Sequence, residues 1–290
     1  NFLIISTSIS GLLRYYVPSV VPTMFSGEDM TKYIEIKQNG NITEVILNRS
    51  ESYNAFNLEM ITELANHLTQ LATDNSVRGV AITGRGKAFC AGGDLKWAVE
   101  FSQKAGSSFH TLASQLHLAI VEIRRMKKPV VAAINGTAAG AGFSFVLACD
   151  FRIIEKSAIL RQAYTSNGLC IDGGGTFTLP RIVGLSRSLE IAAFDEPISS
   201  AKALEWGLVT KVVDDGMVLE EANSMLNKLI KKSTHSFGWS KKLLTDSFNN
   251  SFESHLELER EGLSDCANHS DGQEGLKAFI EKRKPVFGNK

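Results

Sequence analysis

Three short stretches of this sequence combine residues that could do chemistry with turns of very small side chains. Asp172 lies in GLCIDGGGTF, directly before three glycines. The stretches CAGGD (90–94) and AAGAG (138–142) consist mainly of alanine and glycine. A carboxylate can serve as a general acid or base, and small residues let a ligand atom approach the backbone closely. The sequence therefore suggests an acid and two backbone turns as candidate parts of one site.

Asp172 also has a purely structural interpretation. Asp followed by Gly is among the commonest turn signals, because the side chain hydrogen-bonds its own backbone. Taken alone, the Asp-Gly sequence favours a solvated turn residue. The choice depends on the rest of the chain.

The two small-residue turns each follow an apolar segment and precede a segment with helical patterning. In that position, backbone N–H groups are unpaired at the start of the helix, and two of them could hold one oxygen atom. The alternative is that alanine and glycine merely let helices pack against a sheet. Either turn alone leaves both interpretations open, and the two together favour the oxygen-binding one.

The elements that would position these turns alternate between strand and helix. Leu58, Ile61 and Leu64 begin a helical spacing of apolar residues behind Asn57, which is a plausible N-cap. Alternation of this kind predicts an α/β fold, in which ligands bind where turns leave the carboxyl ends of strands. The predicted strands are YIEIK (33–37), EVILN (44–48), GVAIT (79–83) and VVAAI (130–134).

The chain divides into three parts by composition. Residues 1–30 contain two short apolar runs and a single basic residue, Arg14, which is poor for a targeting peptide, so we interpret them as an extension or tag-like segment. Residues 31–213 are predicted to form the core. Residues 214–290 show helical periodicity with charged faces, and their apolar stripes need a partner in the core or in a neighbouring subunit.

Composition excludes several classes of function. Lys plus Arg and Asp plus Glu both number 31, so no net charge attracts nucleic acid or a membrane surface, and no apolar run reaches transmembrane length. The four cysteines form no C-x-x-C pair, which predicts buried thiols in a reducing, cytoplasmic setting and no metal site. The chain has no H-E-x-x-H, G-x-S-x-G or Walker A motif.

His110 and His117 lie seven residues apart without an acidic companion, and we assign them no role.

Four segments in order resemble the crotonase, or enoyl-CoA hydratase/isomerase, superfamily from about Tyr33 to Phe287. The resemblance implies a spiral of ββα units with a helical C-terminal region that builds trimers, often paired into hexamers. It also implies an acyl-CoA thioester as substrate, with no cofactor beyond the coenzyme A that the substrate carries. The segments are KAFCAGGDLKW (87–97), KKPVVAAINGTAAGAG (127–142), the CDFRI run from Cys149, and GTFTLPRIVG (175–184).

The resemblance implies roles for residues of both turns. By position, the N–H groups of Gly93 and Ala141 match the two donors that hold the thioester oxygen in this family, where fixed donors stabilise the enolate charge. The loop around the first donor is implied to bind the substrate. Two C-terminal residues match positions that reach a neighbouring subunit's nucleotide and acyl pocket, although a surface charge and a packing residue are equally good interpretations. These substrate-binding candidates are Ala91, Asp94, Leu95 and Lys96 in the loop, and Lys282 and Phe279 near the C-terminus.

The residues at the acid and base positions decide which reaction to expect. Hydratases of this family use two glutamates, and the matching positions here are Ser144 and Tyr164, which cannot act as carboxylates. Asp172 matches the acid of isomerases in the family, notably those of the phenylacetyl-CoA-epoxide type. In such relatives one Asp removes a proton from C2 of a 3-enoyl-CoA and returns it at C4. The apolar neighbours Leu169, Ile171 and Phe177 are expected to raise the pKa of such a base.

Other functions remain open at this point. An aryl-CoA dehalogenase or thioester hydrolase would use an acid at a comparable place for covalent attack or to activate water. A hydratase of unusual composition is a further alternative. The loss of both hydratase glutamates is also what a non-catalytic acyl-CoA-binding homologue would show. Ser144 fits either a hydrogen-bonding role in the pocket or a place inside a helix.

Overall fold

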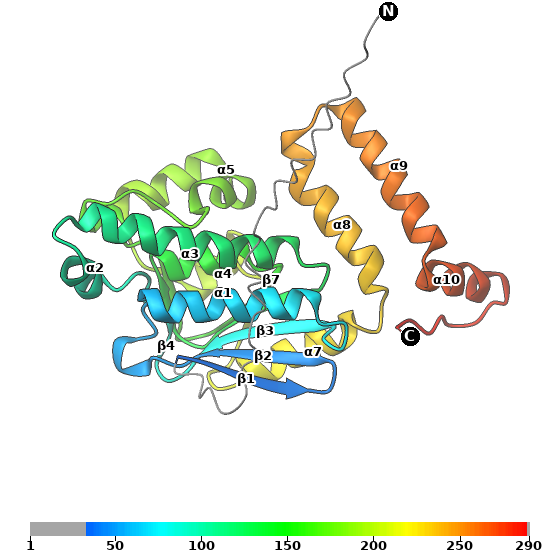
Figure 1. The fold of residues 1–290 in the computed structure, drawn as a ribbon, viewed down its shortest axis with the longest axis horizontal. Helices are drawn as coiled ribbons and strands as arrows, with labels where there is room; N and C mark the ends of the chain where they lie inside the picture. The colour runs from blue at the N-terminus through cyan, green and yellow to red at the C-terminus, as the bar shows by residue number, and fades with distance from the viewer. Residues whose placement is uncertain (1–32, 289–290) are drawn as a thin grey trace, which may run out of the picture. The chain divides into compact units, whose positions relative to one another are not determined.

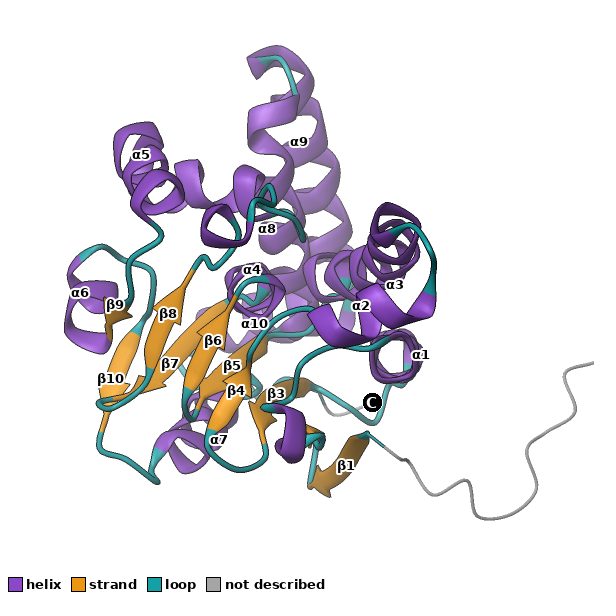
Figure 2. Cartoon of the chain, turned by 90° about the vertical axis from the view of Figure 1, so that its left-hand side faces the viewer, coloured by secondary structure: helices purple, strands orange, loops and turns teal. Residues whose placement is uncertain are grey.

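The computed structural model describes residues 33–288, so the segment 1–30 lies outside the described residues. Its strands form two sheets (Figure 2). The larger sheet has the order β1-β2-β3-β5-β7-β10, in which β1 pairs antiparallel with β2 and the remaining neighbours are parallel. Its strands are Ile34–Asn39 (β1), Ile42–Leu47 (β2), Gly79–Gly84 (β3), Val130–Ile134 (β5), Phe151–Glu155 (β7) and Lys211–Val213 (β10).

The smaller sheet has the order β4-β6-β8-β9 and is parallel up to its last, antiparallel pair. Consecutive strands therefore alternate between the two sheets: β3, β5 and β7 lie in the larger one, and β4, β6 and β8 follow them in the smaller one. Each pair precedes a helix, which gives the expected spiral of ββα units. The strands are Ala88–Cys90 (β4), Thr137–Ala139 (β6), Ile159–Arg161 (β8) and Ile198–Ser199 (β9).

Helices cover both faces of the larger sheet (Figure 1). Alternate residues of its strands face different cores, as the pleat requires. Val80 and Ile82 of β3 join the core beneath α1 and α3, whereas Ala81 joins a smaller core against α7. The helices of the core region are Leu58–Thr73 (α1), Leu95–Phe101 (α2), Ala105–Arg125 (α3), Ala141–Ala148 (α4), Gly175–Phe194 (α5) and Ser200–Glu205 (α6), with short 3-10 turns at Ser50–Ser52 (η1) and Thr165–Asn167 (η2).

The C-terminal region is helical, as its periodicity predicts. Helices α8, α9 and α10 lie to one side of the ββα core in Figure 1. None of the helices within residues 33–288 is long and apolar enough to cross a membrane. The elements are Val218–Leu229 (α7), Thr234–Asp246 (α8), Ser247–Asn249 (η3), Phe252–Asn268 (α9) and Ser270–Ile280 (α10).

The Asn57 cap is confirmed, because its side chain accepts a hydrogen bond from the Met60 N–H at 2.9 Å. Each small-residue turn follows a strand and precedes a helix, as predicted, but two short strands that the sequence analysis did not identify supply the strand ends. The short strands β4 and β6 come between the long strands and the turns. Both turns consequently leave the smaller sheet, where β4 and β6 are hydrogen-bonded neighbours.

Candidate active site

The two small-residue turns pack so closely that their backbone atoms are in contact. Gly92 has φ 101°, and a Cβ atom there would lie 2.8 Å from the Ala139 carbonyl oxygen. A Cβ atom at Gly142 would overlap the Cys90 carbonyl. Only glycine satisfies both requirements, which brings the start of α4 against the end of β4.

Each turn presents one unpaired backbone donor. The neighbours of Gly93 are bonded to Phe56, since Phe56 N–H donates to the Gly92 oxygen at 2.7 Å and Asp94 N–H donates to the Phe56 oxygen at 2.9 Å. Ala141 is the first residue of α4, where an N–H has no intrahelical acceptor. Among residues 33–288, the N–H groups of Gly93 and Ala141 have no backbone acceptor.

Both donors open into a cavity of about 120 Å³. One wall is a stripe of α3 whose apolar residues recur at helical spacing, a pattern already visible in the sequence. The loop before α5 contributes Asp172 to the lining. The lining residues are Phe56, Ala91, Gly93, Leu95, Phe109, Leu112, Ala113, Leu116, Gly140, Ala141, Ala163, Tyr164, Asn167, Leu169 and Asp172.

Asp172 is both a turn residue and a cavity residue. Its carbonyl oxygen accepts a hydrogen bond from Gly175 N–H at 3.1 Å, and the two glycines between them have positive φ, at 61° and 72°. That pair of positive φ values is typical of a type I′ turn, which non-glycine residues adopt only under strain. The turn directs the Asp172 side chain toward the cavity while keeping 36% of it exposed.

Among residues 33–288, the Asp172 carboxylate has one hydrogen-bonding partner, and the sequence interpretation missed it. His117 Nε2 lies 2.8 Å from Asp172 Oδ1. The prediction that Asp172 has apolar surroundings is also wrong in part. The ring of Phe177 packs against the Arg181 guanidinium, whose Cζ lies 3.5 Å from the centroid of that ring. Leu169 lines the cavity, whereas Ile171 packs on the hydrophobic core.

Comparison with known proteins identifies the family of this site. A sequence profile described as enoyl-CoA hydratase/isomerase matches residues 37–290. The chain belongs to the enoyl-CoA hydratase/isomerase family. It is 33% identical to a 1,2-epoxyphenylacetyl-CoA isomerase of Escherichia coli over 90% of this chain and 100% of that protein. It is 35% identical to a probable enoyl-CoA hydratase of Bacillus subtilis over 81% of this chain and 90% of that protein.

A solved structure supports the same assignment at the level of the fold. The crystal structure of an enoyl-CoA hydratase from a Polaromonas species superposes with a TM-score of 0.82 and 34% identity, covering 87% of this chain and 98% of that one. The relatives thus include both hydratases and isomerases. The family is established by these comparisons, and the reaction is not decided by them.

The two positions where hydratases of the family carry glutamates are buried. Ser144 is 0% exposed within α4 and does not line the cavity, while Tyr164 lines it and is 8% exposed. Neither hydroxyl has a hydrogen-bond partner among residues 33–288. Burial, and next the charge of Asp172, raise the pKa of the Tyr164 phenol, which therefore stays protonated. Ser144 is thus a buried helix residue rather than part of the pocket surface.

The loop after Gly93 has a structural function in this family member. Asp94 caps α2 by accepting from the Trp97 N–H at 3.0 Å, and its other oxygen lies 2.7 Å from Arg49 Nη1. Burial opposes the charged carboxylate, but the Trp97 N–H and Arg49 outweigh it and hold the pKa of Asp94 below its usual value. Lys96 is 84% exposed and pairs with Glu100 on the same helix at 4.0 Å, and Ala91 and Leu95 line the cavity.

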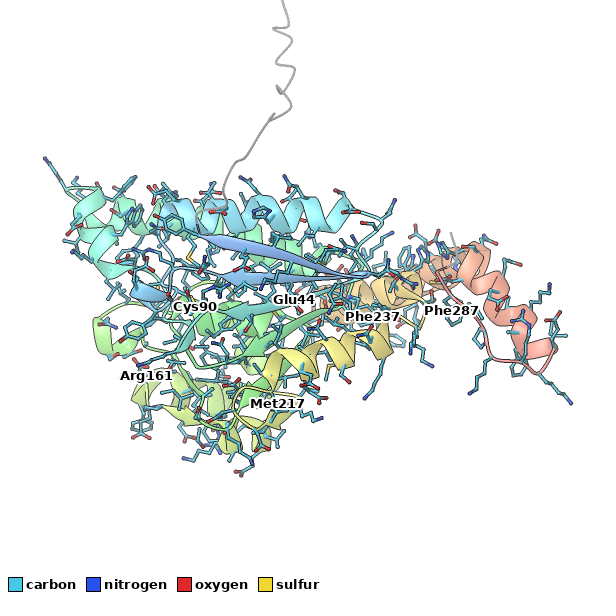
Figure 3. The ribbon with its side chains drawn as sticks, turned by 90° about the horizontal axis from the view of Figure 1, so that it is seen from below. Glu44, Cys90, Arg161, Met217, Phe237 and Phe287 are labelled. Carbon is cyan, nitrogen blue, oxygen red and sulfur yellow. The ribbon has the colours of Figure 1, made fainter. Side chains whose placement is uncertain are left out.

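The two C-terminal candidates are absent from the lining of this cavity. Phe279 is 84% exposed on α10 and Lys282 follows that helix. Figure 3 shows Cys90, beside the small-residue turns, within the left part of the core, and Phe287, near α10, well to its right. Phe279 and Lys282 therefore lie outside the lining of their own chain's cavity.

The prediction of buried thiols holds for Cys90 and Cys149 and is wrong for Cys170, which is exposed, and for Cys266, which is half-buried. Within residues 33–288, no cluster of three or more His, Cys, Asp or Glu residues could hold a metal ion. Cys90 is fully buried beside the turns, and this burial raises the pKa of its thiol to about 12. A thiol held neutral in this way is not a nucleophile.

Proposed function

We propose that this acyl-CoA-processing enzyme converts 3-enoyl-CoA into 2-enoyl-CoA, with Asp172 as the single acid and base. The observation that carries the proposal is the composition of the cavity. It joins two N–H donors without backbone acceptors among residues 33–288 to one carboxylate, and at the one hydratase position that lines it stands Tyr164 rather than a glutamate. This combination suits a reaction in which a proton moves within the substrate and no water is added.

The chemistry needs only these groups. The carboxylate of Asp172 takes a proton from C2, and the electrons of that C–H bond pass into a dienolate whose charge rests on the thioester oxygen. The N–H groups of Gly93 and Ala141 stabilise that oxygen, and removal of one such donor typically costs about 3 to 4 kcal/mol of barrier. Asp172 then returns a proton to C4, which leaves the double bond between C2 and C3.

The geometry of Asp172 supports this role. Oδ1 is bonded to His117, whereas Oδ2 has no hydrogen-bond partner in the described part of the chain. An oxygen without a protein partner is available to accept the proton. The apolar stripe of α3 gives the acyl chain an apolar surface in the same cavity as the donors.

The decisive experiment follows isomerisation of 3-enoyl-CoA by the absorbance of the conjugated thioester, with mass spectrometry of the product. Asp172→Asn keeps the size of the side chain and removes the base, so kcat/KM should fall by about 100- to 10,000-fold. Asp214→Asn is the matched control, because Asp214 is an exposed carboxylate paired with Lys156 on the surface.

The other reactions of the family give different products in the same assay. Gain of one water by 2-enoyl-CoA would establish a hydratase, and release of free coenzyme A would establish a hydrolase. Release of halide from a halogenated aryl-CoA, tested in parallel, would establish a dehalogenase. Binding of acyl-CoA without turnover would establish a non-catalytic homologue. Any of these results without isomerisation would contradict the proposal.

A further inference from the structure

The contact between His117 and Asp172 joins the proposed base to a second titratable side chain. His117 Nε2 lies 2.8 Å from Asp172 Oδ1, and in the described part of the chain the imidazole has no other hydrogen-bonding or ionic partner. The opposite ring nitrogen, Nδ1, is therefore not used by the protein. The pair has one carboxylate oxygen available to the substrate and one imidazole nitrogen available to water.

The position of His117 on α3 places it between the cavity and solvent. Leu116 lines the cavity and is 2% exposed. Consecutive helical residues point about 100° apart, so His117 projects from the rim rather than into the cavity. Its side chain is 54% exposed, and it is absent from the cavity lining. His117 thus touches the base from its solvent side.

We propose that His117 exchanges the proton carried by Asp172 with bulk water during isomerisation. This inference rests on the proposed function. Imidazole is the side chain that takes up and releases protons near neutral pH, and an exposed ring does so in direct contact with water. A carboxylate alone would carry the substrate's own proton from C2 to C4, whereas this pair replaces it with one from solvent.

The steps balance in protons and electrons. While Asp172 is ionised, His117 donates its Nε2–H to Oδ1. Asp172 takes the C2 proton and becomes a neutral carboxylic acid, the exposed imidazole moves its own proton from Nε2 to Nδ1 through water, and rotation of the carboxyl group then brings the substrate proton to the vacated Nε2. The imidazole accepts it as an imidazolium ion and exchanges its N–H protons with water. One proton returns to the carboxylate and then to C4. The net change is one substrate proton released to water and one water proton taken up.

The experiment is isomerisation of unlabelled 3-enoyl-CoA in D2O, stopped at low conversion. Mass spectrometry gives the ratio of singly deuterated to undeuterated 2-enoyl-CoA. The intact protein should form mainly deuterated product. His117→Gln keeps a hydrogen-bond donor for Asp172 but cannot carry a proton as an acid or base. The ratio should therefore fall by about tenfold, a modest part of what a general acid or base contributes.

His110→Gln is the matched control, since His110 is an exposed histidine on the same helix that has no contact with Asp172. It should leave the ratio unchanged. Isomerisation by the intact protein with little deuterium uptake, or an unchanged ratio in His117→Gln, would overturn the role of His117 while the isomerase stands. Absence of isomerisation in the intact protein would overturn both proposals.

Discussion

At the scale of single residues, Tyr164 occupies the position of a hydratase glutamate in the cavity wall but cannot act as an acid or base near neutral pH. Its phenol is buried, has no hydrogen-bond partner among residues 33–288, and has a raised pKa because burial disfavours the phenolate. Such a group neither gives up a proton near neutral pH nor depends on its hydroxyl for stability. The ring, not the hydroxyl, is what Tyr164 contributes to the cavity wall.

Tyr164→Phe tests this interpretation. The ring remains, so kcat/KM for isomerisation should change by less than about tenfold, whereas loss of a working acid or base costs about 100- to 10,000-fold. The free energy of unfolding should stay the same or rise, because a buried unpaired hydroxyl is removed. Steady-state kinetics and urea unfolding measure the two effects. A loss of activity as large as that of Asp172→Asn would show that the phenol takes part in proton transfer.

At the scale of elements, the long strands and helices are readable from the sequence and the contacts between turns are not. The run at 130–134 is continuously apolar, as expected for a parallel strand covered on both faces, and it is β5. Strands β4 and β6 have three residues each, too few to show a period of two. The contact between His117 and Asp172 spans 55 positions and depends on how α3 meets the loop before α5. Nothing local in the sequence marks either residue of that pair as the other's partner.

The first C-terminal helix beyond α7 is joined to the core by a buried ion pair. Lys241 of α8 places Nζ 2.8 Å from Asp150 Oδ2 and donates to the Ile123 carbonyl at 2.6 Å. The same carboxylate oxygen accepts the Val130 N–H at 2.9 Å, where β5 begins. The side chains of Lys241 and Asp150 are 6% and 13% exposed. One side chain of α8 thus bonds both the Asp150 carboxylate and a carbonyl group of α3.

Lys241→Met should lower the free energy of unfolding by about 3 to 5 kcal/mol, because it leaves the Asp150 charge buried without a partner. The double variant Lys241→Met with Asp150→Asn should recover part of this loss, since an amide oxygen can still accept the Val130 N–H. Lys242→Met is the control: Lys242 is 52% exposed and pairs with Asp246 on the surface, where ion pairs contribute less than about 1 kcal/mol. Chemical denaturation measures all three. Equal effects of Lys241→Met and Lys242→Met would contradict the role given to the buried pair.

At the scale of the whole molecule, the C-terminal helices expose large apolar side chains. Contiguous exposed apolar surface generally marks an interface with another protein molecule. We therefore propose that helices α8 to α10 assemble the chain into trimers or pairs of trimers. This assembly would bring Phe279 and Lys282 to a neighbour's cavity, where the family resemblance expects them. The exposed residues include Leu244, Phe248, Phe252, Leu263, Phe279 and Ile280, each at least 69% exposed.

Leu263→Asp tests this assembly, because it places a charge in the middle of α9 on a side chain that is 74% exposed. A charge buried at an interface without a partner is strongly unfavourable, so the variant should sediment or elute as a smaller species than the unaltered protein. Its acyl-CoA affinity should fall as well, since each site would lose the neighbour's Phe279 and Lys282.

Leu204→Asp is the matched control, as Leu204 is 45% exposed on α6, outside the C-terminal region. Light scattering coupled to gel filtration gives the mass of each species. If the unaltered protein is a monomer, or Leu263→Asp keeps the same mass and affinity, then α9 does not hold subunits together and each chain's cavity must bind its substrate without a neighbour.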